Sequence, residues 1–221
     1  MRNCAIMFAL LLLPLGAGAG ELLDQIVVTV NGNALLQSDW DGELHYELFM
    51  SGRPVSGVTA LDRQSALDRI VDQELLREQM RTADFKAASR EEIETQLALL
   101  KKEHEQENAN QPWTVRLHEY GLTEADVRGH VELELNQLRV IDARLRPSIE
   151  VNSAEVETYY KEKVLPQTAG KPSVSMAEAE PKIREILVQQ RMNQLLDSWL
   201  QSLHAQAKIQ HFPPSPEGKQ P

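Results

Sequence analysis

A short hairpin near the start of the chain most constrains the fold. Residues 26–30 (IVVTV) alternate with the period of a strand, and residues 34–36 supply a return strand. Asn31 and Gly32 lie between them, and both residue types tolerate the positive φ of a type I′ turn. A hairpin alone is marginally stable in water. Only residues 207–212 (AKIQHF) offer a third strand, so we expect the two chain ends to pair in one domain.

The sequence between these strands is typical of helices with short breaks. Apolar stripes recur at helical spacing, for example Leu67, Ile70 and Leu75 among charged neighbours. Capping boxes begin at Ser89 and Ser175, where an acidic side chain follows three positions later. We expect helices at about 39–50, 61–80, 89–107, 113–121, 124–146, 153–163 and 176–206, with Ser38 or Asp39 capping the first. The predicted fold class is mostly α, with a small antiparallel sheet joining the chain ends.

Two long helices should form much of the core. The apolar positions of the helix after Thr123 are Val127, Val131, Leu135, Leu138, Ile141 and Leu145, and those of the last helix are Ile183, Leu187, Met192, Leu195, Trp199 and Leu203. Between the helices that end near 163 and begin near 176, the sequence LPQTAGKPSVS contains two prolines and a glycine. We therefore expect residues 165–175 to form a loop.

The first helix carries more apolar residues than a surface helix needs. Trp40, Leu44 and Leu48 lie on one predicted face, while Tyr46, Phe49 and Met50 lie on another. One interpretation is that long helices bury both faces. The other is that Tyr46, Phe49 and Met50 line an exposed apolar groove that binds an extended or unfolded peptide.

The first nineteen residues have the pattern of an export signal. Arg2 precedes an apolar run that is too short to span a bilayer, and small residues through Ala19 follow it. Cleavage after Ala19 would remove Cys4, the only cysteine, which excludes disulfides and thiol chemistry from the mature chain. We expect residues 1–19 to be a signal peptide, 20–212 to form one module, and the proline-rich residues 213–221 to be a disordered tail.

The charge of the chain and its lack of known motifs argue against several classes of function. The formal net charge of −10 makes the chain a poor candidate for binding nucleic acid or anionic membranes, and no stable membrane insertion is expected after cleavage. No phosphate-binding glycine loop, catalytic serine motif or zinc motif occurs, so we expect no catalytic residue, metal or cofactor.

His130, Glu132 and Glu134 are close in sequence but diverge on a helix, which favours a solvated face over a metal site. Trp113, Tyr159 and Tyr160 fit the edge of a core better than a ligand site.

Several segments together resemble a known family. The segments are DQIVVTVNGNALLQSDWDGEL, ALDRIVDQELLREQM, the stretch from YGLTEADV to VETYYKEK, and the final SMAEAEPKIREILVQQRMNQLLDSWLQSLHAQAKI. In this order they resemble the N-terminal module and C-terminal helix of the SurA family of periplasmic chaperones, over about residues 24–212. The resemblance implies a periplasmic protein whose clients are unfolded polypeptides, including outer-membrane proteins.

Members of that family carry one or two parvulin-type prolyl isomerase domains between the Tyr-Tyr helix and the last helix. Residues 165–175 are too few for such a domain, which has roughly the size of an ordinary small domain. We therefore expect an ATP-independent holding chaperone, with the low aromatic content of 5% limiting its contacts with clients. The alternatives are a prolyl isomerase or an isomerase-associated folding factor, and an envelope scaffold for one folded partner.

Overall fold

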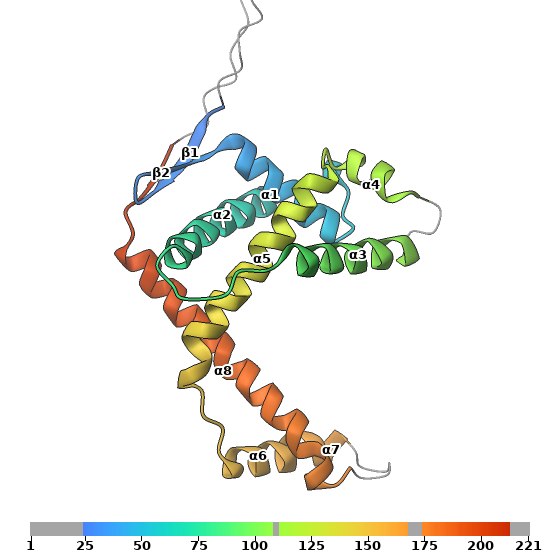
Figure 1. Ribbon diagram of the computed structural model, residues 1–221, viewed down its shortest axis with the longest axis vertical. Coiled ribbons are helices and arrows are strands. Elements are labelled where there is room, and N and C mark those ends of the chain that lie inside the picture. Colours follow the sequence, from blue (N-terminus) through green and yellow to red (C-terminus); the bar gives the residue numbers. More distant parts are fainter. Residues whose placement is uncertain (1–23, 108–110, 168–173, 213–221) are drawn as a thin grey trace, which may run out of the picture.

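The computed structural model describes residues 24–107, 111–167 and 174–212. Figure 1 shows an upper body that contains the sheet and helices α1 to α5, and a lower lobe that contains α6 and α7. The long helix α8 runs from the sheet to the lower lobe and so belongs to both parts. The helices are α1 (Gln37–Met50), α2 (Ala60–Met80), α3 (Arg90–Glu107), α4 (Trp113–Glu119), α5 (Glu124–Leu145), α6 (Ser153–Tyr159), α7 (Leu165–Gln167) and α8 (Met176–Gln206). The predicted mostly α fold class is confirmed.

The sheet joins the two chain ends, as expected from the need of the hairpin for a third strand. Its strands are β1 (Ile26–Val30), β2 (Asn33–Leu36) and β3 (Ile209–His211), in the order β2-β1-β3 with both pairs antiparallel. Asn31 and Gly32 have φ values of 51° and 93°, as the tight turn requires. β3 is shorter than the predicted 207–212, because the Ala207 amide still donates to carbonyls of the last turn of α8.

Side-chain caps fix the helix starts. The backbone N–H of Glu178 donates to the Ser175 hydroxyl, and the Ser175 N–H donates to the Glu178 carboxylate at 2.9 Å. Ser89 and Glu92 make the same reciprocal pair, which confirms both predicted boxes. The predicted cap of the first helix was wrong. That helix already begins at Gln37, because the Asp39 carboxylate accepts the Leu36 N–H at 2.8 Å from inside the first turn.

Four clusters of buried side chains hold the molecule together. One cluster packs α1, α3, α4 and α5 around Phe49 and Trp113, and a second packs the sheet on α2. A third joins α2 and α5 to the middle of α8 through Ile141 and Met192. The fourth forms the lower lobe around Val156 and the start of α8. None of the described helices is long and apolar enough to cross a membrane.

One predicted core position on α5 is exposed. Leu138 retains 54% of its accessible surface, although it lies on the predicted apolar face. The N-terminal half of that face packs in the upper body and its C-terminal half packs on α8. Leu138 lies between these two contacts, beside an opening that Phe85 and Met192 also line.

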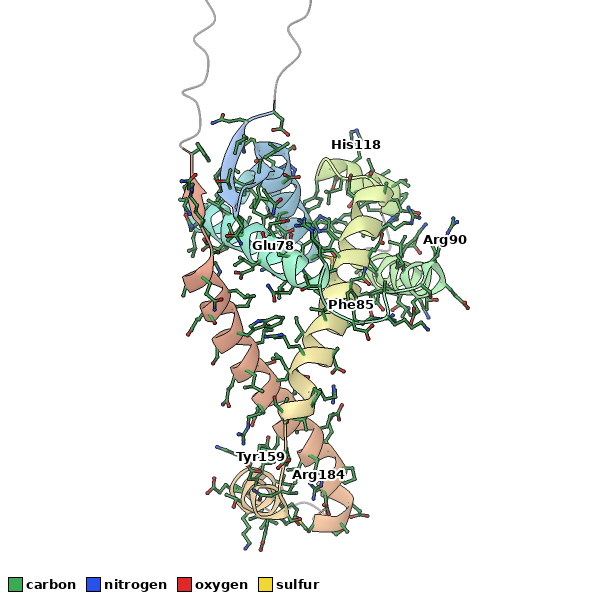
Figure 2. The ribbon with its side chains drawn as sticks, turned by 60° about the vertical axis from the view of Figure 1, so that its left-hand side comes forward. Glu78, Phe85, Arg90, His118, Tyr159 and Arg184 are labelled. Atoms are coloured by element: carbon green, nitrogen blue, oxygen red, sulfur yellow. The ribbon has the colours of Figure 1, made fainter. Side chains whose placement is uncertain are left out.

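The lower lobe corrects one prediction for residues 165–175. After α6 the chain makes a π-helical turn at Tyr160–Val164, and Leu165–Gln167 remain helical despite Pro166, while residues 168–173 lie outside the described part. Tyr159 and Tyr160 pack at the edge of the lobe's core, and the Tyr160 hydroxyl donates to the Val174 carbonyl at 2.7 Å. In Figure 2 the labelled Tyr159 and Arg184 both lie in this lobe, where the Arg184 guanidinium donates to the Val151 carbonyl at 2.8 Å.

Candidate functional site: a groove between four helices

An open groove of about 760 Å³ lies where α1, α2, α5 and α8 meet. Its walls combine apolar side chains with charged ones, and its far side is formed by Leu196 and Leu200 of α8. The residues that line it are Glu43, Leu44, Tyr46, Glu47, Leu48, Met50, Ser51, Arg53, Asp62, Arg69, Asp72, Gln73, Leu76, His130, Leu133, Glu134, Gln137, Ile141, Leu196 and Leu200. The volume is in the range of ligand pockets, and the open shape admits an extended chain.

The face of α1 toward this groove has regular helical spacing. Glu43, Tyr46, Glu47 and Met50 follow one another at positions i, i+3, i+4 and i+7, and all four line the groove. Tyr46 is half-buried, and Met50 keeps 43% of its surface exposed. The groove therefore contains two of the three residues that the sequence suggested for peptide binding.

Phe49, the third of those residues, lies in the core. Its side chain is fully buried, stacks on the His104 ring at 4.3 Å between centroids, and meets Trp113 edge-on at 5.3 Å. Successive helical residues are rotated by about 100°, so Phe49 shares the core with its neighbour Leu48 while Met50 turns toward the groove. Grouping Phe49 with Tyr46 and Met50 as an exposed face was therefore wrong, because Phe49 cannot touch a bound chain in this conformation.

A buried carboxylate lies at the wall between α1 and α2. Glu43 is only 3% exposed, and one of its oxygens accepts a hydrogen bond from the Gln73 amide at 2.9 Å. The Arg69 guanidinium lies 3.4 Å from the other oxygen, and it also pairs with Glu47 one turn later on α1. Removal from water raises the pKa of Glu43, although Gln73 and then Arg69 oppose that rise.

His130 of α5 closes the same cluster. Its imidazole ring stacks on Tyr46 with centroids 3.9 Å apart and planes 5° from parallel, and its Nδ1 lies 3.6 Å from a Glu43 oxygen. Burial lowers the pKa of His130, and burial followed by the charges of Glu134 and Glu43 raises the pKa of Tyr46 to about 12. Both rings are therefore neutral near pH 7, and their stack ties α5 to α1.

The sequence did not indicate this polar cluster. His130 was expected on a solvated helix face, but Tyr46 of α1 stacks on it, and no role was predicted for Glu43 or Gln73. The available signal was weak: Glu43 precedes Tyr46 by three residues, so a charged and an aromatic residue share a face of an otherwise apolar helix. No pattern within α1 shows which residues of α2 and α5 lie opposite.

The arrangement is suited to non-covalent binding. The groove combines apolar contact surface with carboxylates and guanidiniums. Several of these charges already pair, Arg69 of α2 with Glu47 of α1 and Arg53 with Asp62. In the described ranges, no three histidine or acidic side chains converge as a metal site would require. His118, labelled in Figure 2 at the far end of α4, is remote from the groove and does not line it.

Of the comparisons with known proteins, only the one with solved structures bears on the fold. No family model matches the chain, and no curated protein matches its sequence. A solved structure does match, with a TM-score of 0.51 and 8% sequence identity, over 85% of this chain and 99% of the other. It comes from a structural study of the virulence factor PEB4 and the periplasmic protein Cj1289 of Campylobacter jejuni, two structurally related SurA-like chaperones. This chain therefore has a mostly α, SurA-like fold.

Proposed function

We propose that this protein is an exported, ATP-independent holding chaperone that binds unfolded polypeptides, outer-membrane proteins among them, in the groove between α1, α2, α5 and α8. One observation carries the proposal. A SurA-like fold, which similar proteins named as chaperones also have, surrounds an open groove with apolar side chains from four helices. An unfolded chain exposes apolar side chains of its own, and burying them against such a surface is favourable without any chemical step.

The groove favours weak and reversible binding. Met50 and the half-exposed Leu196 and Leu200 provide apolar area, each Å² of which contributes about 25 cal/mol when covered. An unfolded client also loses conformational freedom when it is held, which offsets part of that gain. Release therefore requires no nucleotide, which suits a compartment outside the cytoplasm.

The location is part of the proposal. The export signal that the sequence predicts at residues 1–19 lies outside the described residues, and the study of the similar structure names a periplasmic protein, Cj1289, beside the virulence factor PEB4. We expect the mature chain to begin near Gly20 in the periplasm.

An aggregation assay tests the proposal. A urea-unfolded outer-membrane protein is diluted into buffer with or without the mature chain, and light scattering reports aggregation. We expect Met50→Ser to weaken suppression several-fold, because the side chain is exposed within the groove. Leu61→Ser is the matched control, since Leu61 is 74% exposed but does not line the groove. An inactive wild-type protein, or equal losses in both variants, would contradict binding in the groove.

Phe49 gives a contrasting expectation on stability. Because it is fully buried, Phe49→Ala should lower the free energy of unfolding by about 3–5 kcal/mol, whereas Met50→Ala should change it by at most about 0.5 kcal/mol. Urea unfolding followed by circular dichroism measures both. Similar small changes for the two variants would show that the core and groove sides of α1 have been assigned wrongly.

A further inference from the structure

The groove carries an excess of negative charge that its own residues do not neutralise. Five carboxylates line it, against the guanidiniums of Arg53 and Arg69 and a His130 whose pKa is lowered by burial. The chain as a whole is also acidic, with a formal net charge of −10. A negatively lined groove attracts segments of opposite sign and disfavours acidic ones.

Four of the five carboxylates already have partners. Arg69 pairs with Glu43 and Glu47, and the pairs Arg53–Asp62 and His204–Asp72 account for the other two. Glu134 is the fifth: it is exposed on α5, and within the described ranges no cation lies at ion-pair distance from it. A carboxylate on the groove wall is thus available to a cation brought by the client.

A second unpartnered group lies one turn further along α5. The side-chain nitrogen of Gln137 is buried, lines the groove and finds no hydrogen-bond partner in the described part of the chain. A buried donor without an acceptor costs about 1–3 kcal/mol, so a turn of the Gln137 side chain toward a client carbonyl in the groove would relieve that cost. Glu134 and Gln137 are three residues apart and share one face of α5, at the spacing of neighbours on a helix.

We infer that the segment this groove accepts is an extended chain with a lysine or arginine beside apolar residues. Its cation pairs with the Glu134 carboxylate, a backbone carbonyl of the client accepts from the Gln137 amide, and its apolar side chains contact Met50, Leu196 and Leu200. This inference rests on the proposed function. It adds the charge of the preferred client and names Glu134 as the residue that recognises that charge.

Binding of short unstructured peptides tests this inference. Three fluorescent peptides share one apolar sequence and differ only at the central position, which is Lys, Gln or Glu. We expect the mature wild-type chain to bind the Lys peptide roughly twofold to fivefold more tightly than the Glu peptide, the range for an exposed ion pair. Added salt should reduce that preference, because exposed charges are screened.

Variants of Glu134 and of a control residue distinguish a local role of Glu134 from an effect of the net charge. Glu134→Gln should remove most of the preference for the Lys peptide over the Glu peptide, and Glu134→Lys should reverse that preference. Glu132→Gln is the matched control, since Glu132 is exposed on the same helix, does not line the groove, and changes the net charge equally. Because both residues are exposed, the far-UV spectra of all variants should match the wild type.

Each outcome decides between the proposals. Equal binding of all three peptides, with Met50→Ser still weakening it, would leave the chaperone proposal in place and overturn the charge preference. A preference that Glu134→Gln and Glu132→Gln reduce equally would overturn the role of Glu134. No binding of any peptide would overturn both proposals.

Discussion

At the scale of single residues, the environment of each side chain decides its role more than its type does. Phe49 and Met50 are neighbours in sequence, yet one lies in the aromatic core with Trp113 and the other faces the groove. The same holds for two glutamates. Glu92 caps α3 in contact with water, and bonds from the backbone and then the hydroxyl of Ser89 lower its pKa to about 2. Glu43 has lost most of its contact with water, and its pKa is raised.

Glu43 should therefore make stability depend on pH in an unusual direction. Because its native pKa lies above the ordinary value near 4.5, the native state binds the proton before the unfolded chain does. As pH falls through the raised pKa, this residue adds stability, and as pH rises through it that stability is lost. The exposed Glu92 acts oppositely, since its stabilising effect is lost below its ordinary pKa.

The variant Glu43→Gln isolates this effect. It keeps the shape and an oxygen that can accept from Gln73, but it carries no charge near Arg69, Glu47 and His130. We expect the variant to be more stable than the wild type at pH 7, with the difference shrinking toward pH 4. Thermal unfolding between about pH 4 and pH 8 measures it, with Glu132→Gln as the exposed control. A variant that is less stable at pH 7 would show that the Arg69 and His130 contacts outweigh the cost of burial.

At the scale of elements, the third strand holds the chain ends together. β3 pairs with β1 at Val28, Thr29 and Val30, and the Asn31 N–H donates to the Lys208 carbonyl at 3.0 Å. The Asn31 side chain in turn accepts the Lys208 N–H at 2.8 Å. The hairpin is therefore part of a three-stranded sheet that covers α2, which gives it the support that an isolated hairpin lacks.

Deleting residues from Ala207 onward should consequently lower the melting temperature by several degrees. The deletion removes the β3 pairing and exposes the buried Val28 and Val30 of β1. Deleting only 214–221 leaves β3 in place and should change the melting temperature little. Differential scanning calorimetry of both truncated chains measures the effect. Equal melting temperatures would show that the pairing of β3 with β1 does not stabilise the fold.

Local rules predicted elements well and their contacts poorly. The Asn-Gly turn, the Ser175 box and the pairing of β3 with the hairpin all follow from short patterns, because each depends on a few adjacent residues or on one missing partner. Leu138 and His130 were assigned wrongly, since the exposure of a helical residue depends on which other helix covers it. For the same reason, Tyr46 and Met50 are the only residues that the sequence correctly suggested as part of a groove.

At the scale of the whole molecule, α8 connects two parts with different partners. Its start packs with α6 in the lower lobe around Ile183, its middle packs on α5, and its end leads into the sheet. Figure 1 shows the lower lobe set apart from the upper body, with α8 and the segment after α5 leading to it. The lobe is also where SurA-like chains with isomerase domains would branch, between the Tyr159–Tyr160 segment and α8.

The absence of room for such a domain gives the last prediction. Only residues 165–175 separate the π-helical turn from α8, and the Tyr160–Val174 hydrogen bond joins the two sides directly. A domain with its own core needs at least about 50 residues. We therefore expect the purified mature chain to leave prolyl cis–trans exchange at its uncatalysed rate, which takes tens to hundreds of seconds at 25 °C. The measurement follows exchange in a proline-containing peptide, and an added prolyl isomerase shows that the assay responds. Acceleration that co-purifies with the chain and disappears in Met50→Ser would place an activity in the groove itself and overturn the proposal that this protein holds its clients without catalysis.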